Sequence, residues 1–345
     1  MKIDQKLLKI IYKYFPDNKI DPSYWRDILK TTKSFSSMYH LSSMVKYYVS
    51  YYSDYGSFNL SIILYHDKQA VGIMPLMAHK NKNNEWVLSS NGTEIVEPIF
   101  KKDTPQKIIK NSETKILNLI LDLSKQLKIK SCQFVNMEFF KLSNWYLKIL
   151  ELSKETFTTH HLLVDLSLSV EEIKLKFRKS YKSLINKGFR EWKIKVYEIV
   201  SDDQFEKFRL LHKSIAGKST RSVESWKIQR DIVNSKDSFV ITVSDKKDLL
   251  VGFGLFVCSN KIGSYAVGAY KRELFSKPLG HAVQMKAIEI LKSKGFQWYE
   301  IGNKHLKIDK IKPTEKELSI SFFKEGFATD VLARHHLILN ITSEY

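Results

Sequence analysis

The sequence predicts an α/β (α+β) protein of two domains, each built on a mixed, mostly antiparallel sheet flanked by helices. Its 345 residues exceed the usual length of one domain, and 43% of them are hydrophobic, which is ample for two cores. The order of helix and strand patterns is the same in both halves: helices, a meander of strands, then helix, strand, helix and strand. One stretch, 262–303, reads as strand, tight loop, helix and strand, which is typical of an α/β unit.

The first half begins with an amphipathic helical pattern in which Leu7 and Ile11 recur at helical spacing. Two alternating, β-branched runs then flank His66-Asp67-Lys68, which predicts a hairpin. The predicted helices are 1–30, 104–127 and 141–152, and the predicted strands are 58–66, 69–78, 86–90, 95–100, 130–137 and 161–166.

The second half repeats this order. Its first helix is expected to stop at Lys187-Gly188, because glycine favours the end of a helix. The predicted helices are 170–186, 202–215, 223–233, 279–294 and 314–324, and the predicted strands are 192–199, 238–244, 249–259, 262–270, 296–301 and 331–339.

The boundary between the domains is expected near Leu168, which gives domains 1–168 and 169–345. No Gly/Ser-rich or Pro-rich linker marks this boundary, so tightly packed halves are expected.

The chain is strongly basic, with a formal net charge of +19. This favours anionic partners: nucleic acid, an anionic membrane face or a phosphate-bearing substrate. Nine basic residues fall between Lys174 and Lys195. On one helix, Arg178 and Lys182 would be i,i+4 neighbours that repel, so the run indicates either a bound counter-anion or a solvated basic face.

Two cysteines, Cys132 and Cys258, are too few for a disulfide framework or a Cys-rich metal site, and no metal site is expected. No apolar run approaches the roughly 18–20 residues of a membrane span. We therefore expect a cytoplasmic protein, whose basic surface is compatible with a peripheral contact at an anionic inner membrane.

The turn before the predicted helix 279–294 has the composition of a phosphate site. It contains Lys277, Leu279, Gly280 and Ala282. Unpaired amides and the positive end of the helix dipole would face an anion there. The same residues also suit a plain strand–helix connection, because short glycine motifs have low specificity.

Four segments in order resemble the FemAB/FemX-type transferases of the GNAT superfamily. The segment 162–187 resembles the family's opening of the second domain with its basic helix. HAVQMKAIEILKSKGFQWYEIGN at 281–303 resembles its helix and Y-D-x-G-G strand, and SISFFKEGF at 319–327 resembles F-K-x-x-F-G. The segment 211–229 resembles a stretch of the free-standing FemAB-like acyltransferases.

The resemblance implies two GNAT-like domains, the first degenerate and the second holding the donor site. It implies transfer of an acyl or aminoacyl group to an amine of a cell-envelope glycan precursor. The co-substrate would be acyl-CoA or aminoacyl-tRNA, with no permanently bound cofactor. Lys277-x-x-Gly280-x-Ala282 comes near the GNAT pyrophosphate signature but has lysine where Arg or Gln is usual.

Acyl transfer requires a base for the amine, and the candidates are His281, Glu300 and Tyr270. Amides at the open end of the strand 262–270 would stabilise the developing oxyanion. By resemblance, Lys324 helps to hold the donor or the oxyanion. Three of these candidates have a simpler interpretation: His281 as a surface histidine, Glu300 as a structural carboxylate, and Lys324 as a lysine at a solvated helix end.

Substrate contacts are expected from two places. The first is the basic pair Arg178 and Lys182. The second lies between two predicted helices, where an arginine could grip phosphate or carboxylate and a tryptophan could pack on a sugar, unless that tryptophan is a core residue. These candidates are Thr220, Arg221, Trp226 and Gln229.

Two functions follow from the sequence. The first is a cytoplasmic N-acyltransferase or aminoacyltransferase that acts on a nucleotide- or lipid-linked amino sugar. The second is a basic, non-catalytic module that binds nucleic acid or anionic membrane. The turn around Gly280 favours the enzyme, and the net charge of +19 favours the module.

Overall fold

The computed structural model describes residues 5–341 and divides the chain into two compact units. Unit 1 combines the residues up to Thr158 with those from Arg334 on, and unit 2 comprises Thr159–Ala333. This division differs from the predicted contiguous halves, because the C-terminal strand returns to unit 1.

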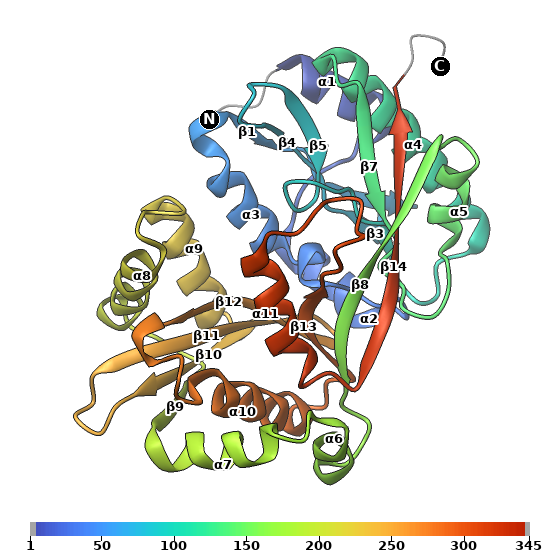
Figure 1. Cartoon of the computed structure of the whole chain (residues 1–345). Coiled ribbons are helices and arrows are strands. Elements are labelled where there is room, and N and C mark those ends of the chain that lie inside the picture. Colours follow the sequence, from blue (N-terminus) through green and yellow to red (C-terminus); the bar gives the residue numbers. More distant parts are fainter. Residues whose placement is uncertain (1–4, 342–345) are drawn as a thin grey trace. The chain divides into compact units, whose positions relative to one another are not determined.

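Unit 1 contains small antiparallel sheets and the long helix α4 (Figure 1). The sheet orders are β1-β4-β5 and β2-β3-β6, and β7 pairs antiparallel with β14. Its elements are α1 (Gln5–Tyr14), α2 (Pro22–Thr31), η1 (Met38–His40), α3 (Ser42–Tyr51), η2 (Ser53–Tyr55), β1 (Ser57–Asn59), β2 (Ile62–His66), β3 (Gln69–Met74), β4 (Met77–Lys80), β5 (Trp86–Ser89), β6 (Ile99–Phe100), α4 (Gln106–Leu127), β7 (Ser131–Val135), α5 (Asn144–Leu150), the first residues of β8 (Glu155–Asp165) and most of β14 (Asp330–Asn340).

Unit 2 is built on one sheet in which β8, β13, β12, β11, β10 and β9 lie in that order. All pairs are antiparallel except β12 with β13. In Figure 1, α8 and α9 lie on the opposite face of this sheet from α7 and α10. Its elements are α6 (Val170–Lys176), α7 (Tyr181–Glu191), β9 (Lys193–Tyr197), α8 (Asp202–Ala216), α9 (Val223–Asn234), β10 (Ser238–Ser244), β11 (Leu250–Cys258), β12 (Ile262–Tyr270), η3 (Arg272–Leu274), α10 (Leu279–Ser293), β13 (Trp298–Lys304) and α11 (Glu315–Glu325).

Local signals account for several element boundaries. Capping boxes begin three of the described α-helices, α6, α8 and α11. Ser169, Ser201 and Thr314 accept amide hydrogens there, and a Glu or Gln side chain reaches back. The predicted hairpin is confirmed: β2 pairs with β3, and Asp67 and Lys68 both have positive φ, as a type I′ hairpin turn requires.

Three predicted elements are divided in the structure. The helix predicted over 1–30 is α1 and α2, and its residues 1–4 lie outside the described part. The strand predicted over 58–66 is β1 and β2, which belong to different sheets. The helix predicted over 170–186 is α6 and α7, separated at Phe177–Ser180.

The prediction that Gly188 stops a helix is wrong. Gly188 lies inside α7, where a Cβ would come within 2.8 Å of the Pro278 carbonyl oxygen and 3.0 Å of the Ala282 Cβ. The glycine is needed because α7 and α10 approach each other closely at this point.

Each unit has its own apolar core. In unit 1, α1 and α4 cover β-strand residues such as Phe134 and Leu337. In unit 2, α7 and α10 cover residues such as Phe256 and Tyr299. The fold class predicted from the sequence, mostly antiparallel sheets flanked by helices, is confirmed.

Candidate active site

Two neighbouring parallel strands of unit 2 separate part-way along their length. β12 and β13 pair only through 262–264 and 298–300. Beyond that point β12 continues beside β11, and β13 continues beside β8. The facing backbone groups past Ser264 and Glu300 are therefore not bonded to each other, and we call this place the fork.

Glu300 lies at the fork and is held by two side chains. One carboxylate oxygen is 2.6 Å from Nδ1 of His161, and the other accepts a hydrogen bond from the Ser264 hydroxyl at 3.3 Å. His161 comes from β8 and is only 8% exposed. A carboxylate fixed in this way has a defined orientation, as a base requires.

Lys324, near the end of α11, brings a cation to the same carboxylate. Burial lowers the pKa of Lys324 to about 8, although the charge of Glu300 acts in the opposite direction. Its Nζ lies 5.3 Å from the centroid of the Tyr265 ring. The solvated helix end considered from the sequence is therefore not its environment.

Gly302 makes room for this lysine. It follows a bulge in β13, where the register with β8 shifts, and its φ is +144°. A Cβ at this position would collide with the Lys324 ammonium. The backbone conformation requires glycine, and a larger residue would also displace the end of the Lys324 side chain.

Tyr270 does not have the properties of a base at neutral pH. Its hydroxyl accepts a hydrogen bond from Tyr265 at 3.2 Å, and burial raises the pKa of Tyr270 well above its ordinary value. Burial also raises the pKa of Tyr265 to about 12. Both phenols stay protonated at neutral pH, so they can donate protons but not accept them.

The turn predicted to hold phosphates leads into α10 without a capping side chain. Lys277 is exposed, Gly280 is partly exposed, and Leu279 and Ala282 are buried. The Leu279 amide bonds to the Lys277 carbonyl, so the amides that follow it form the open end of the helix. The Phe323 ring lies against Gly280 and covers one side of this turn.

His281 is enclosed by aromatic rings and is not a simple surface residue. The centroids of the Tyr181 and Phe323 rings lie 4.6 Å and 5.1 Å from its own. Burial lowers the pKa of His281 to about 4, and the positive charge of Arg178 makes a smaller contribution in the same direction. The neutral imidazole has a buried Nδ1 with no hydrogen-bond partner among the described residues.

Arg178 and Lys182 are not neighbours on one helix, because Arg178 lies between α6 and α7. The guanidinium of Arg178 donates to the Phe322 carbonyl at 2.9 Å and to the Tyr181 hydroxyl at 3.0 Å, and Tyr181 donates to the Phe323 carbonyl. Arg178 therefore caps the end of α11. Lys182 is exposed on α7, so the predicted repulsion between the two does not arise.

The four candidates near α9 are brought together, but as a packed cluster. Arg221 donates to Gln229 at 3.1 Å and lies 4.8 Å from the Trp226 ring centroid. Thr220 directly precedes Arg221, and its hydroxyl is buried. Trp226 is 3% exposed, so the expectation that it packs on a sugar is corrected: it is a core aromatic beside His212.

Three residues of the fork were missed from the sequence: His161, Ser264 and Gly302. His161 and Glu300 are 139 positions apart, and no local pattern connects them. Gly302 carried a usable signal, because an isolated glycine within a strand pattern indicates a bulge or a close contact.

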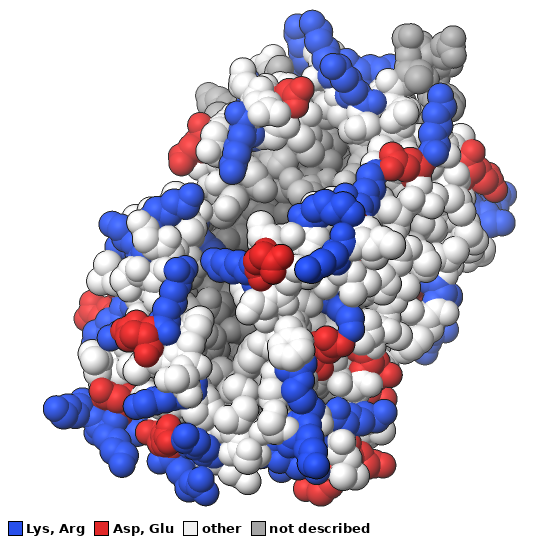
Figure 2. Space-filling view, in the orientation of Figure 1, with Lys and Arg blue, Asp and Glu red and all other residues white. Residues whose placement is uncertain are grey.

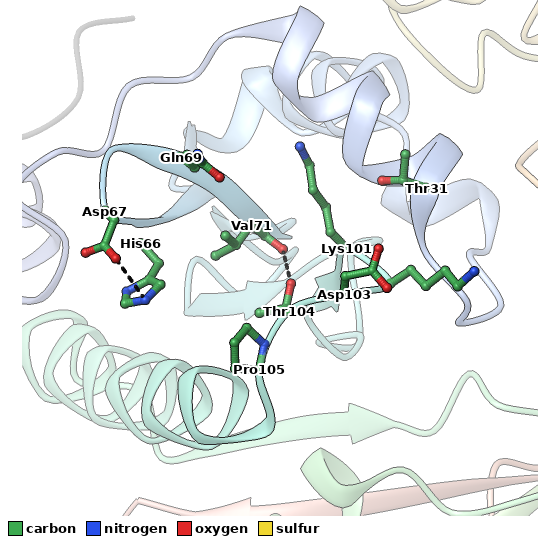
Figure 3. A pocket seen from close by; sticks show the side chains of 10 residues that line it. Thr31, His66, Asp67, Gln69, Val71, Lys101, Asp103, Thr104 and Pro105 are labelled. Carbon is green, nitrogen blue, oxygen red and sulfur yellow. Dashed lines mark hydrogen bonds and ion pairs between the residues drawn. The ribbon is translucent and has the colours of Figure 1, made fainter.

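Basic side chains outnumber acidic ones on the face shown in Figure 2. A cavity of about 580 Å³ opens in unit 1 (Figure 3), lined by residues that include His66, Asp67 and Lys101. Lys101 is bridged to Asp27 at 2.6 Å, and His66 to Asp67 at 3.4 Å. The cavity is thus mixed in charge, and none of the predicted site residues lines it.

Within residues 5–341, no group of three or more His, Cys, Asp or Glu side chains is arranged to hold a metal ion. In the same range, none of the helices combines the length and the apolar character that crossing a membrane requires.

No protein-family model matches the sequence, and no curated protein matches it. Solved structures do match. FemX shares 13% identity and a TM-score of 0.66, with 92% of this chain and 96% of FemX covered. The chain has the fold of FemX.

Two further structures extend the FemX-like comparison. L-PGS from Bacillus licheniformis has a TM-score of 0.58 at 12% identity. The match covers 94% of this chain and 93% of the L-PGS chain. The C-terminal domain of a protein assigned as a lysylphosphatidylglycerol synthetase from Agrobacterium fabrum has a TM-score of 0.62 at 9% identity, covering 97% and 93%. At these identities the likeness establishes the fold, and the FemX-like resemblance is confirmed at that level.

Proposed function

We propose that this protein is an N-acyltransferase or aminoacyltransferase that transfers an acyl group to an amine of a cell-envelope precursor. The observation that carries the proposal is the fork, where a carboxylate held by His161 lies beside a lysine with a pKa of about 8. The FemX-like fold supports the same class of reaction.

Each group at the fork suits one part of such a transfer. Glu300 takes the proton that the amine loses as the new N–C bond forms. The Lys324 ammonium faces the negative charge on the donor carbonyl oxygen. The C–S bond of a thioester or the C–O bond of an aminoacyl ester then breaks, and the leaving group takes a proton from Tyr270 or from water.

The donor is acyl-CoA or aminoacyl-tRNA, and both carry phosphates. The open end of α10, with exposed Lys277 beside it, supports a phosphate contact at Gly280. The acceptor is an amino group of a nucleotide- or lipid-linked glycan precursor. A protein named as a lysylphosphatidylglycerol synthetase shares the fold, which adds a lipid as an acceptor class to test, with the aminoacylated lipid as the product.

The test is transfer of radiolabelled acyl groups from acyl-CoA and from charged tRNA to a panel of amino-sugar nucleotides and amino lipids. With a donor and an acceptor between which transfer is detected, Lys324→Ala is expected to lower kcat by roughly 10²–10³-fold. Glu300→Gln is expected to lower it by roughly 10²–10⁴-fold. Lys247→Ala, in the exposed β10–β11 turn, is the matched control and should keep wild-type activity. Absence of transfer with every pair would count against the proposal.

The alternative, a non-catalytic basic module, remains a hypothesis supported by the net charge of +19. It predicts tight binding of tRNA or anionic vesicles that Lys324→Ala and Glu300→Gln leave unchanged. Negligible affinity for both tRNA and anionic vesicles at about 150 mM salt would exclude this alternative function.

A further inference from the structure

The loop of residues 305–314, which joins β13 to α11, combines two exposed aliphatic side chains with lysines. Ile308 is 83% exposed and Ile311 is 69% exposed. Lys307, Lys310 and Lys312 are exposed around them. Basic side chains gather over this connection on the face shown in Figure 2. Exposed aliphatic groups this close together among cations indicate a surface that meets something both apolar and anionic.

The loop has a defined turn. The Asp309 carboxylate accepts the Leu306 amide at 2.8 Å, and the Asp309 amide donates to the Leu306 carbonyl at 3.0 Å. The Lys312 ammonium donates to the Lys307 carbonyl at 3.2 Å. These bonds give the backbone around Ile308 a defined turn, and the Ile308 side chain is exposed within it.

We propose that the 305–314 loop docks unit 2 on an anionic lipid surface. Ile308 and Ile311 enter the boundary between headgroups and acyl chains, where aliphatic side chains leave water. The lysines stay at the level of the lipid phosphates, and their long stems allow this. A lipid surface of negative charge matches the charge and the apolar character of the loop together.

Nucleic acid fits this loop less well. Single strands are held by cations together with aromatic rings that stack on bases. The apolar side chains here are aliphatic isoleucines, which cannot stack. Binding to tRNA is therefore an outcome of the test and not the interpretation that the loop favours.

The loop joins two elements of the fork, β13 and α11, and its β13 end is bonded to α11. The His305 amide donates to the Ser321 hydroxyl at 2.9 Å, and Lys304 pairs with Glu325, so β13 is fastened to α11. If the proposed function holds, docking would bring the fork close to a lipid-linked acceptor. The binding itself does not depend on that function.

The experiment places a fluorophore that responds to apolar surroundings at position 308, through Ile308→Cys. The natural Cys132 and Cys258 react slowly, because burial raises the pKa of their thiols to about 11 and about 12. Vesicles of 30% phosphatidylglycerol and 70% phosphatidylcholine are compared with pure phosphatidylcholine at 150 mM salt. We expect the fluorescence emission to shift to shorter wavelengths with the anionic vesicles and to stay unchanged with pure phosphatidylcholine.

The matched control is Leu249→Cys, labelled in the same way. Leu249 is 54% exposed and follows Lys246 and Lys247 in the β10–β11 turn, so it repeats the composition elsewhere in unit 2. We expect no shift at this position. An equal shift at both labels, or none at position 308, would overturn the proposal.

Unlabelled variants measure the contribution of the loop. Ile308→Ser with Ile311→Ser should weaken sedimentation with the anionic vesicles by at least about tenfold, whereas Leu249→Ser should have no effect. If the double variant instead loses tRNA binding and wild-type protein does not sediment with vesicles, the surface recognises nucleic acid and the proposal fails. No donor or acceptor is present in these assays, so failure of the proposed function leaves their result intact.

Discussion

Lys324 illustrates how burial changes what a residue can do. A lysine with a pKa of about 8 is mostly charged at pH 7 but loses its proton within the range in which enzymes are assayed. A helix-terminal lysine with an ordinary pKa would remain charged there.

The rate of acyl transfer should therefore fall above about pH 8, by up to tenfold per pH unit, because the neutral amine no longer stabilises an oxyanion. Lys324→Arg should show no such fall above pH 8, because the guanidinium stays charged. Its maximal kcat should be lower than that of the wild type. The measurement is a kcat profile from pH 6 to pH 10. A wild-type profile that is flat through pH 9 would contradict this role.

The same lysine should cost the protein stability. Its pKa is lower in the folded state, about 8, than the ordinary 10.5, so the unfolded chain binds more protons between these values and stability rises with pH there. Lys324→Met should raise the free energy of unfolding by about 2 kcal/mol below pH 8, and the gain should vanish near pH 10.5.

Urea unfolding at pH 7 and at pH 10.5 tests this expectation. Lys247→Met, at an exposed turn, serves as the control and should change neither value. A Lys324→Met protein that is less stable than wild type at pH 7 would show that the lysine contributes favourable contacts that outweigh its burial.

Among the secondary-structure elements, α7 and α10 depend on one close contact. Gly188 allows α7 to lie against the start of α10, where a Cβ would come within 2.8 Å of the Pro278 carbonyl oxygen. This contact positions the open end of α10 and with it the turn around Gly280.

Gly188→Val should lower the free energy of unfolding by about 1–3 kcal/mol, because overpacking forces the two helices apart. It should also raise the KM for the donor more than it changes kcat, since it moves the open end of α10. Asn186→Val is the control on the same helix, at an exposed position. Equal effects of both variants would attribute the loss to helix propensity.

Considered as a whole, the molecule is not two consecutive halves. β8 and β14 each begin in one unit and end in the other, and the C-terminal strand completes unit 1 beside β7. Residues at the end of the chain therefore stabilise a unit formed mainly by its beginning.

Leu337→Ala should lower the free energy of unfolding by about 2–5 kcal/mol, because Leu337 is fully buried in the core of unit 1 with Phe134. Val331→Ala, in the exposed part of the same strand, should cost less than about 0.5 kcal/mol. Denaturant unfolding followed by far-UV circular dichroism makes the comparison. Similar losses for the two variants would argue against a shared core.

Much of the fold could be predicted because its signals are local. Helical periodicity identified α4 and α10 within two residues of their ends, and the turn at Asp67 and Lys68 identified the β2–β3 hairpin. Each of these depends on neighbours a few positions apart, so the backbone preferences and the apolar pattern already select the conformation.

The site depended on contacts between residues far apart in the chain. Glu300 is a candidate from the sequence because the segment 281–303 resembles the family's helix and strand, but its partner His161 is 139 positions away and comes from β8. Arg178 was expected on a basic helix, yet its guanidinium caps α11. Such pairings form only when the sheet brings distant strands together, and hydrophobic packing of the whole unit sets that arrangement. The amino-acid order thus specified which helices and hairpins form, whereas packing specified which side chains meet at the fork.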